Sequence, residues 1–135
     1  MGIMWVKKDM TQNSLINNYK RDAILSAPPG KLLLMHYDGA LQNMNLSLKA
    51  LDRNDRAGFG FYLCKGQAIV AELLNTLDHK AGSEIATNLE KLYLFVIDRL
   101  THANLMREGE GIHDSIRILT TLKEGWNDAV NQTAG

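Results

Sequence analysis

The chain has 135 residues, enough for one domain around one hydrophobic core. Fifteen basic residues balance 15 acidic ones, so the formal charge is zero, which argues against a general nucleic-acid binder and against a polybasic membrane-binding segment. The same near-zero charge gives little electrostatic protection against self-association and therefore allows a homodimer.

Cys64 is the only cysteine, so the chain cannot form an internal disulfide, as is typical of a reducing compartment. Residues 1–10 contain no long apolar run followed by a small-residue cleavage site, and we therefore expect no signal peptide. No segment approaches the roughly 18 uninterrupted apolar residues of a membrane span. These features predict a cytoplasmic protein without membrane insertion.

The first part of the chain differs from the rest. We expect a flexible segment over residues 1–18 and one helical domain over residues 19–131, with a short extra helix between Asn13 and Leu25. Pro28-Pro29 marks the start of the first long helix near Lys31, because proline suits a first helical turn. The apolar residues of this long helix repeat with helical spacing: Leu33, Tyr37, Ala40, Leu41, Met44, Leu48 and Leu51.

A second helix is expected from Asp55 to His79. The polar run 52–55 predicts the preceding turn, in which Asn54 or Asp55 caps this helix. Gly66 is expected to allow another helix to approach closely, and Cys64 to be a small core residue. The apolar face is predicted to contain Tyr62, Gly66, Ile69, Val70, Leu73 and Leu77.

Two further helices follow glycine-containing breaks. Ser83 can cap the third, whose apolar stripe is Ile85, Leu89, Leu92, Tyr93, Val96, Leu100 and Ala103. The fourth follows a turn at Arg107–Gly111, and its tail is expected to fray over residues 131–135. Its apolar stripe is Ile112, Ile116, Leu119, Leu122, Trp126 and Val130. Four helices of about 20 residues with short polar turns predict an all-α fold, an antiparallel up-down four-helix bundle with a short extra N-terminal helix.

The sequence offers no convincing active site, so we expect no enzyme, no cofactor and no metal. A di-metal site in a bundle needs a Glu-x-x-His pair on each of two helices. Only Glu110 and His113 have this spacing, and they lie across the glycine-rich turn. No phosphate loop, dinucleotide fingerprint or Gly-x-Ser-x-Gly motif is present.

Other polar residues have a structural interpretation. Charged residues such as Arg99 and Lys123, which neighbour opposite charges in the sequence, are interpreted as solvated surface. Tyr19, Tyr37 and Tyr93 each supply an apolar body with a polar tip, which suits a binding surface. Periodicity alone favours ordinary bundle packing for these tyrosines over a binding role.

Three stretches follow one another along the chain: APPGKLLLMHYDGA at residues 27–40, KGQAIVAELL at residues 65–74 with Leu77-Asp78, and GSEIATNL at residues 82–89 with Leu92-Tyr93. In order and spacing they resemble the motifs of the flagellar secretion chaperone family, FliS. Leu100, Ala103-Asn104, Leu122 and Trp126 complete the match, which covers roughly residues 18–126. The chain departs from the family pattern at His36, Gly66 and Ser83.

This resemblance implies a chaperone that binds the C-terminal segment of flagellin, which is disordered before assembly. It implies that the bound segment cannot polymerise prematurely and is delivered to the flagellar export apparatus, with export-gate or regulatory proteins as further partners. A disordered amphipathic segment can place apolar anchors in grooves between helices. The alternative is a generic helical adaptor or dimerisation module, which would self-associate and show no preference for flagellin.

We expect the partner-binding groove to use apolar and tyrosine residues of the matched stretches, with Asn88 bonding to the backbone of the partner. The predicted set is Tyr19, Leu32, Leu34, Met35, Tyr37, Asn88, Leu92, Tyr93 and Phe95. Leu32, Leu34 and Phe95 lie off the main apolar stripes. They are therefore expected to be surplus apolar surface available to a partner.

Overall fold

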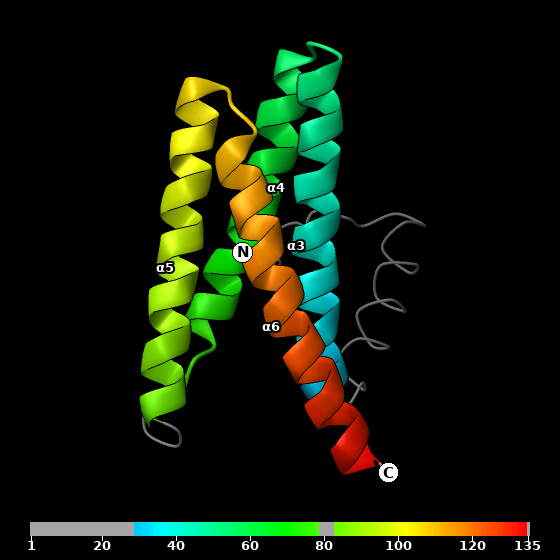
Figure 1. Ribbon diagram of the computed structural model, residues 1–135, viewed down its shortest axis with the longest axis vertical. Coiled ribbons are helices and arrows are strands. Elements are labelled where there is room, and N and C mark those ends of the chain that lie inside the picture. The colour runs from blue at the N-terminus through cyan, green and yellow to red at the C-terminus, as the bar shows by residue number, and fades with distance from the viewer. Residues whose placement is uncertain (1–28, 79–82, 135) are drawn as a thin grey trace, which may run out of the picture. The chain divides into compact units, whose positions relative to one another are not determined.

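The computed structural model describes residues 29–78 and 83–134, and within these ranges it contains four α-helices and no strand. This confirms the predicted all-helical fold. The helices are α3 (Pro29–Asp52), α4 (Arg56–Asn75), α5 (Ser83–Met106) and α6 (Glu110–Ala134), coloured from blue to red along the chain in Figure 1. No helix in the described ranges is long and apolar enough to cross a membrane.

The chain divides into two compact units, and the bundle belongs to the second, Leu33–Gly135. Of the first unit, Met1–Leu32, the structure describes only the start of α3. The predicted flexible segment 1–18 and the predicted helix between Asn13 and Leu25 lie outside the described residues.

The first two helices begin where the sequence indicates. α3 starts at Pro29, and Asn54 adopts a φ of 58° in the turn that follows the helix. Asp55 is the N-cap of α4, since its carboxylate accepts a hydrogen bond of 2.9 Å from the backbone N–H of Gly58. The prediction that α4 extends to His79 is wrong: Thr76 is its C-cap, and the Thr76 hydroxyl donates to the Leu73 carbonyl at 2.8 Å.

The last helix is longer than predicted at both ends. α5 starts at Ser83, the residue predicted to cap it, and α6 starts at Glu110, inside the predicted turn Arg107–Gly111, with an acidic residue in its first turn. A negative charge there interacts favourably with the positive end of the helix dipole. At the other end α6 continues to Ala134, so the prediction of a frayed tail over residues 131–135 is wrong for residues 131–134.

The core consists largely of the predicted stripes. Its largest fully buried apolar side chains are Tyr37, Tyr93, Phe59, Met44, Leu63, Leu100, Ile112 and Leu119. Each buried side chain of leucine or phenylalanine size contributes about 1.5–3 kcal/mol to folding. Three positions predicted to face the core are exposed instead: Cys64 on α4, and Ile85 (65%) and Leu92 (36%) on α5.

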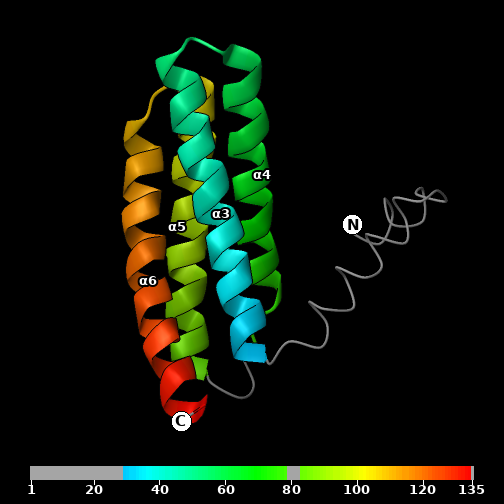
Figure 2. The same ribbon diagram turned by 90° about the vertical axis from the view of Figure 1, so that its right-hand side faces the viewer.

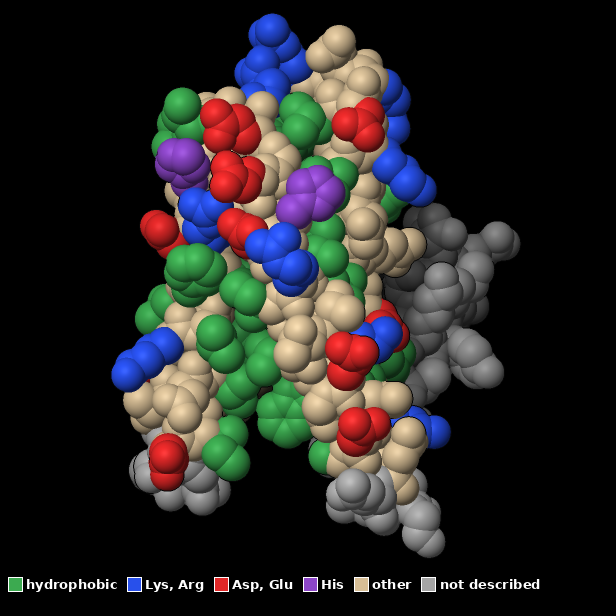
Figure 3. Space-filling view, viewed as in Figure 1, with side chains coloured by type: hydrophobic (Ala, Val, Ile, Leu, Met, Phe, Trp, Pro, Cys, Tyr) green, Lys and Arg blue, Asp and Glu red, His purple; other side chains and the backbone are tan. Residues whose placement is uncertain are grey.

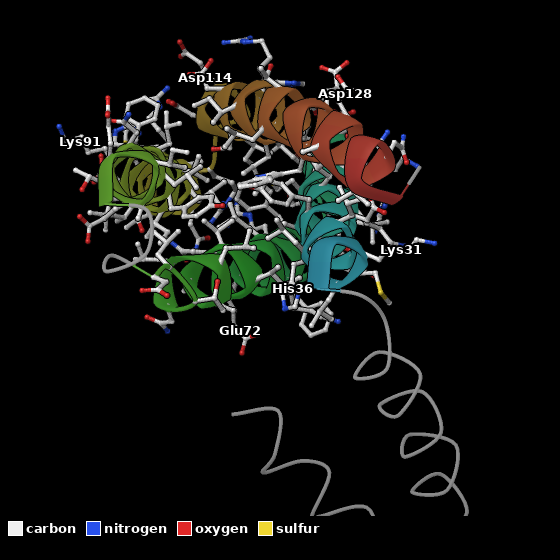
Figure 4. All side chains as sticks on the ribbon, turned by 90° about the horizontal axis from the view of Figure 1, so that it is seen from below. Lys31, His36, Glu72, Lys91, Asp114 and Asp128 are labelled. Carbon is white, nitrogen blue, oxygen red and sulfur yellow. The ribbon has the colours of Figure 1, made fainter. Side chains whose placement is uncertain are left out.

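The four helices enclose this core, and side chains fill the space between them in the view from below (Figure 4). α4 and α5 are joined by Gln67, whose amide donates to the Ile97 carbonyl at 2.9 Å. α5 and α6 are joined by an ion pair of 2.8 Å between Arg99 and Asp114. α3 lies beside both α4 and α6, as Figures 2 and 4 show from two directions.

Two glycines permit close approach of neighbouring helices. A Cβ at Gly66 would lie 3.4 Å from the Ala40 carbonyl oxygen, which confirms the predicted close contact and leaves just enough room for alanine. A Cβ at Gly111 would lie only 2.7 Å from the Arg99 carbonyl oxygen. The contact between α5 and α6 at Gly111 therefore requires glycine.

We expect Gly111→Ala to lower the free energy of unfolding by about 1–3 kcal/mol, because the new methyl group meets backbone that cannot rotate away. Gly125→Ala is the matched control in the same helix, since a Cβ there meets nothing within 4 Å. It should raise the free energy of unfolding by about 1 kcal/mol through helix propensity alone. Urea denaturation measures the free energy of unfolding of both variants. Equal changes in the two would show that Gly111 is not a close contact.

Candidate functional site

Three polar side-chain groups, two tyrosine hydroxyls and one indole N–H, meet in the core and link α3, α5 and α6. The hydroxyls of Tyr37 on α3 and Tyr93 on α5 lie 2.5 Å apart, and the indole N–H of Trp126 on α6 donates to the Tyr37 hydroxyl at 3.1 Å. Tyr37 is 0% exposed and Tyr93 is 1% exposed. Both belonged to the predicted partner-binding set, but in this structure they offer no accessible surface and instead position the helices around them.

Burial raises the pKa of both tyrosines above the ordinary value of 10.0, and for Tyr93 the hydrogen bond with Tyr37 raises it further. Both hydroxyls are therefore protonated at neutral pH and can act as donor and acceptor at once. The network is neutral and saturates the polar atoms that would otherwise be buried without partners.

The free energy of unfolding should fall as the pH rises above about 10, because tyrosines ionise more easily in the unfolded chain than in the core. The raised native pKa means that this contribution is present below the ordinary value of 10.0 and is lost as the pH rises through the native pKa. Tyr93→Phe should flatten this dependence in urea denaturation measured over a pH series. Tyr62→Phe, a partly exposed control, should change it little, and identical profiles for the two variants would contradict the prediction.

A groove lies between α5 and α6. The α5–α6 groove is defined by the five residues that line a hollow of about 420 Å³: Leu92, Arg117, Ile118, Thr121 and Leu122. Apolar side chains gather in the lower half of this face in Figure 3, where the surface is hollowed, while charged side chains gather above. Such an exposed apolar surface is typical of an interaction site.

Residues of α5 extend the apolar surface beyond the groove. Ile85, Asn88, Leu92 and Phe95 are spaced by three or four residues, so they share one face of the helix. Ile85 is 65% exposed, Leu92 36% and Phe95 49%. Asn88 is exposed among them and carries both a donor and an acceptor.

Charged residues connect α6 to its two neighbours. The Arg99 guanidinium donates to Asp114 at 2.8 Å, and Arg117 also pairs with Asp114. The hydrogen bond from Arg99 is the main reason why the pKa of Asp114 is lowered. Lys123 of α6 pairs with Asp38 of α3. The interpretation as solvated surface is therefore wrong for Arg99, whose side chain is only 27% exposed, whereas Lys123 and Asp38 pair at the surface with 37% and 58% of their side chains exposed.

The structure separates the predicted site residues into two groups. Asn88, Leu92 and Phe95 lie together on α5 beside the groove. Leu32 and Leu34 are half-buried and Met35 is 46% exposed, and all three belong to α3, which does not line the groove. Tyr19 lies outside the described residues.

The sequence interpretation missed the α6 wall of the groove: Arg117, Ile118, Thr121 and Leu122. Leu122 belongs to the predicted core stripe, and it is half-buried. Ile118 follows Ile116 by two residues and so lies off that stripe. It carries the same surplus apolar signal that singled out Phe95, and applying that criterion to the fourth helix would have found it.

The described ranges contain no group of three or more His, Cys, Asp or Glu residues that could hold a metal ion. The exposed thiol of Cys64 accepts a hydrogen bond of 3.7 Å from the Asn104 amide. What the molecule presents is therefore an apolar surface between helices. Such a surface can bind another chain.

Comparison with known proteins identifies the family. The model of the family described as flagellar protein FliS matches residues 11–133. The chain belongs to the FliS family. It is 35% identical over 105 residues to the flagellar secretion chaperone FliS of Salmonella typhimurium, covering 77% of this chain and 78% of that protein. It is 31% identical over 122 residues to the FliS of Campylobacter jejuni, covering 90% and 95%.

A solved structure has the same FliS-family fold. The crystal structure of a flagellar chaperone from bacteria aligns with a TM-score of 0.73 at 18% sequence identity, covering 90% of this chain and 99% of that one. At this identity the comparison supports the fold alone. The resemblance seen in the sequence motifs is thus confirmed by the family match, and it connects the chain to flagellum biogenesis and export.

Proposed function

We propose that this FliS-family chain is a cytoplasmic flagellar export chaperone that binds the disordered C-terminal segment of flagellin. Binding would keep flagellin from polymerising prematurely and aid its delivery to the export apparatus. The observation that carries the proposal is the α5–α6 groove, an apolar hollow of about 420 Å³ on the surface of a FliS-family bundle.

The groove suits an amphipathic segment that orders on binding. Leu92 and Ile118 provide apolar contacts for anchor side chains, while Thr121 in the groove and the exposed Asn88 beside it offer hydrogen bonds to the backbone of the segment. Ordering a disordered segment costs about 2–5 kcal/mol or more of the interaction energy. Such a complex can therefore cover a large surface and still release its partner at the export apparatus.

The second group of predicted residues supports a segment that extends beyond one groove. Met35 is 46% exposed on α3, and the neighbouring Leu34 is half-buried. We propose that a flagellin segment passing over more than one face contacts these residues as well, together with Tyr19. Export-gate or regulatory proteins would then use surface that this segment leaves uncovered.

The chaperone that we propose is an antiparallel up-down bundle with a short extra N-terminal helix. Pairs of residues between α4 and α5 support the antiparallel order. Cys64 contacts Asn104, and Gln67 contacts Thr101 with 2.7 Å between the side-chain nitrogen and oxygen. Residue numbers thus rise along one helix as they fall along its neighbour.

Titration calorimetry of the full chain against a flagellin C-terminal peptide of roughly forty residues should give one-to-one binding with a negative heat-capacity change. Leu92→Gln and Phe95→Gln should each weaken binding by about ten-fold, because each removes an apolar anchor. Leu105→Gln is the matched control, since Leu105 is 79% exposed on the same helix but lies off the face shared by Asn88, Leu92 and Phe95.

Equal losses in all three variants would place the binding site elsewhere. Absence of binding by the folded parent chain would reject the flagellin proposal. Helix content measured by circular dichroism should be unchanged in every variant, because the three side chains are at least 36% exposed.

A different observation favours a second candidate, a helical adaptor or homodimer. Phe61 and Met106 are each 56% exposed and Leu105 is 79% exposed, and none of them lines the α5–α6 groove. A dimer that uses these exposed side chains should appear in sedimentation velocity as an increase of the sedimentation coefficient with protein concentration. Leu105→Gln should abolish this increase. A monomer at all concentrations would reject this candidate.

A further inference from the structure

The course of α6 gives the α5–α6 groove its width. At its start α6 touches α5: a Cβ at Gly111 would lie 2.7 Å from the Arg99 carbonyl oxygen, and Asp114 bonds to Arg99 at 2.8 Å. Towards its end α6 turns away from α5 and approaches α3, as Figures 1 and 4 show from two directions. The groove occupies the angle that opens between the two helices.

Two side-chain bonds tie the second half of α6 to α3. The Trp126 indole N–H donates to the Tyr37 hydroxyl at 3.1 Å, and the Lys123 ammonium group pairs with the Asp38 carboxylate. Lys123 and Trp126 are three residues apart and so lie on one face of α6, while their partners are adjacent on α3. Tyr37 is itself fixed by its hydrogen bond to Tyr93.

Burial of the apolar surface of the groove would favour a movement of α6 away from α3 and towards α5. Leu92 on the α5 wall is 36% exposed and Ile118 on the α6 wall is half-buried, so water contacts apolar atoms along both walls. An α6 free to pivot near Gly111 would bury these side chains by moving towards α5. A Cβ at Gly125 meets nothing within 4 Å, so there is open space beside the second half of the helix.

We propose that Trp126 and Lys123, through Tyr37 and Asp38, form a clamp that holds the second half of α6 away from α5 and so sets the width of the groove. The clamp positions one wall of the binding site and touches no bound segment itself. This deepens the proposed function, on which the identity of the bound segment rests. The width of the empty groove does not depend on that identity.

The groove width can be measured in the full chain without a partner. Spin labels at Lys91→Cys on α5 and Asp128→Cys on α6, both exposed, report the separation of the two helices in a Cys64→Ser background. Figure 4 shows these two positions on different helices at the outer surface. Pulsed electron paramagnetic resonance then gives the distribution of distances between the labels.

Trp126→Phe removes the N–H donor but keeps an aromatic ring in place, and Lys123→Glu turns the ion pair into repulsion. Each should shift the distances to shorter values and weaken flagellin-peptide binding by roughly five-fold. The double variant Asp38→Lys with Lys123→Glu restores opposite charges and should restore both readouts. Arg53→Glu is the control, because it breaks an ion pair with Asp55 in which the two side chains are similarly exposed, at 57% and 38%. It should change neither the label distances nor peptide binding.

Unchanged distances in Trp126→Phe and Lys123→Glu would overturn the clamp, whatever the peptide does. Shifted distances that the charge swap restores support the clamp even if the parent chain binds no flagellin peptide, and in that case the proposed function fails alone. Shifted distances that the charge swap does not restore would overturn the role of the ion pair between Asp38 and Lys123.

Discussion

The hydroxyl groups of Tyr37 and Tyr93 lie inside the core, and the arrangement of the helices depends on their meeting there. A buried polar group without a partner costs about 1–3 kcal/mol, so α3 and α5 are held in the register that brings the two oxygens together. Trp126 extends the same constraint to α6. Apolar packing alone tolerates small sliding movements between helices, whereas hydrogen bonds between fixed atoms do not.

The α5–α6 groove is a consequence of where these constraints act. α6 is in contact with α5 at Gly111, and its second half is bonded to α3 through Trp126 and Lys123. One face of α5 therefore retains exposed leucine and phenylalanine side chains that a closed bundle would bury. A surface of this kind costs stability in the free protein and is useful when another chain covers it, as expected of a chaperone of the FliS family.

Ion pairs between the helices contribute more to orientation than to stability. The side chains of Lys123 and Asp38 are 37% and 58% exposed, and pairs with this exposure contribute about 0–1 kcal/mol. Arg99 and Asp114 are less exposed and lie where α6 meets α5. Each pair joins α6 to a neighbouring helix at a defined point along its length.

Local patterns in the sequence specify the helices, most of the core and the family. Apolar residues at helical spacing and the capping carboxylate of Asp55 depend on local geometry, and the family motifs follow from residue order. The packing of the helices determines that Leu92 of α5 and Ile118 of α6 share a surface, and that Tyr37 and Tyr93 pair inside the core. It also decided that Lys123 bonds to Asp38, because contacts between helices depend on their relative rotation and angle, which no periodicity within a single helix encodes.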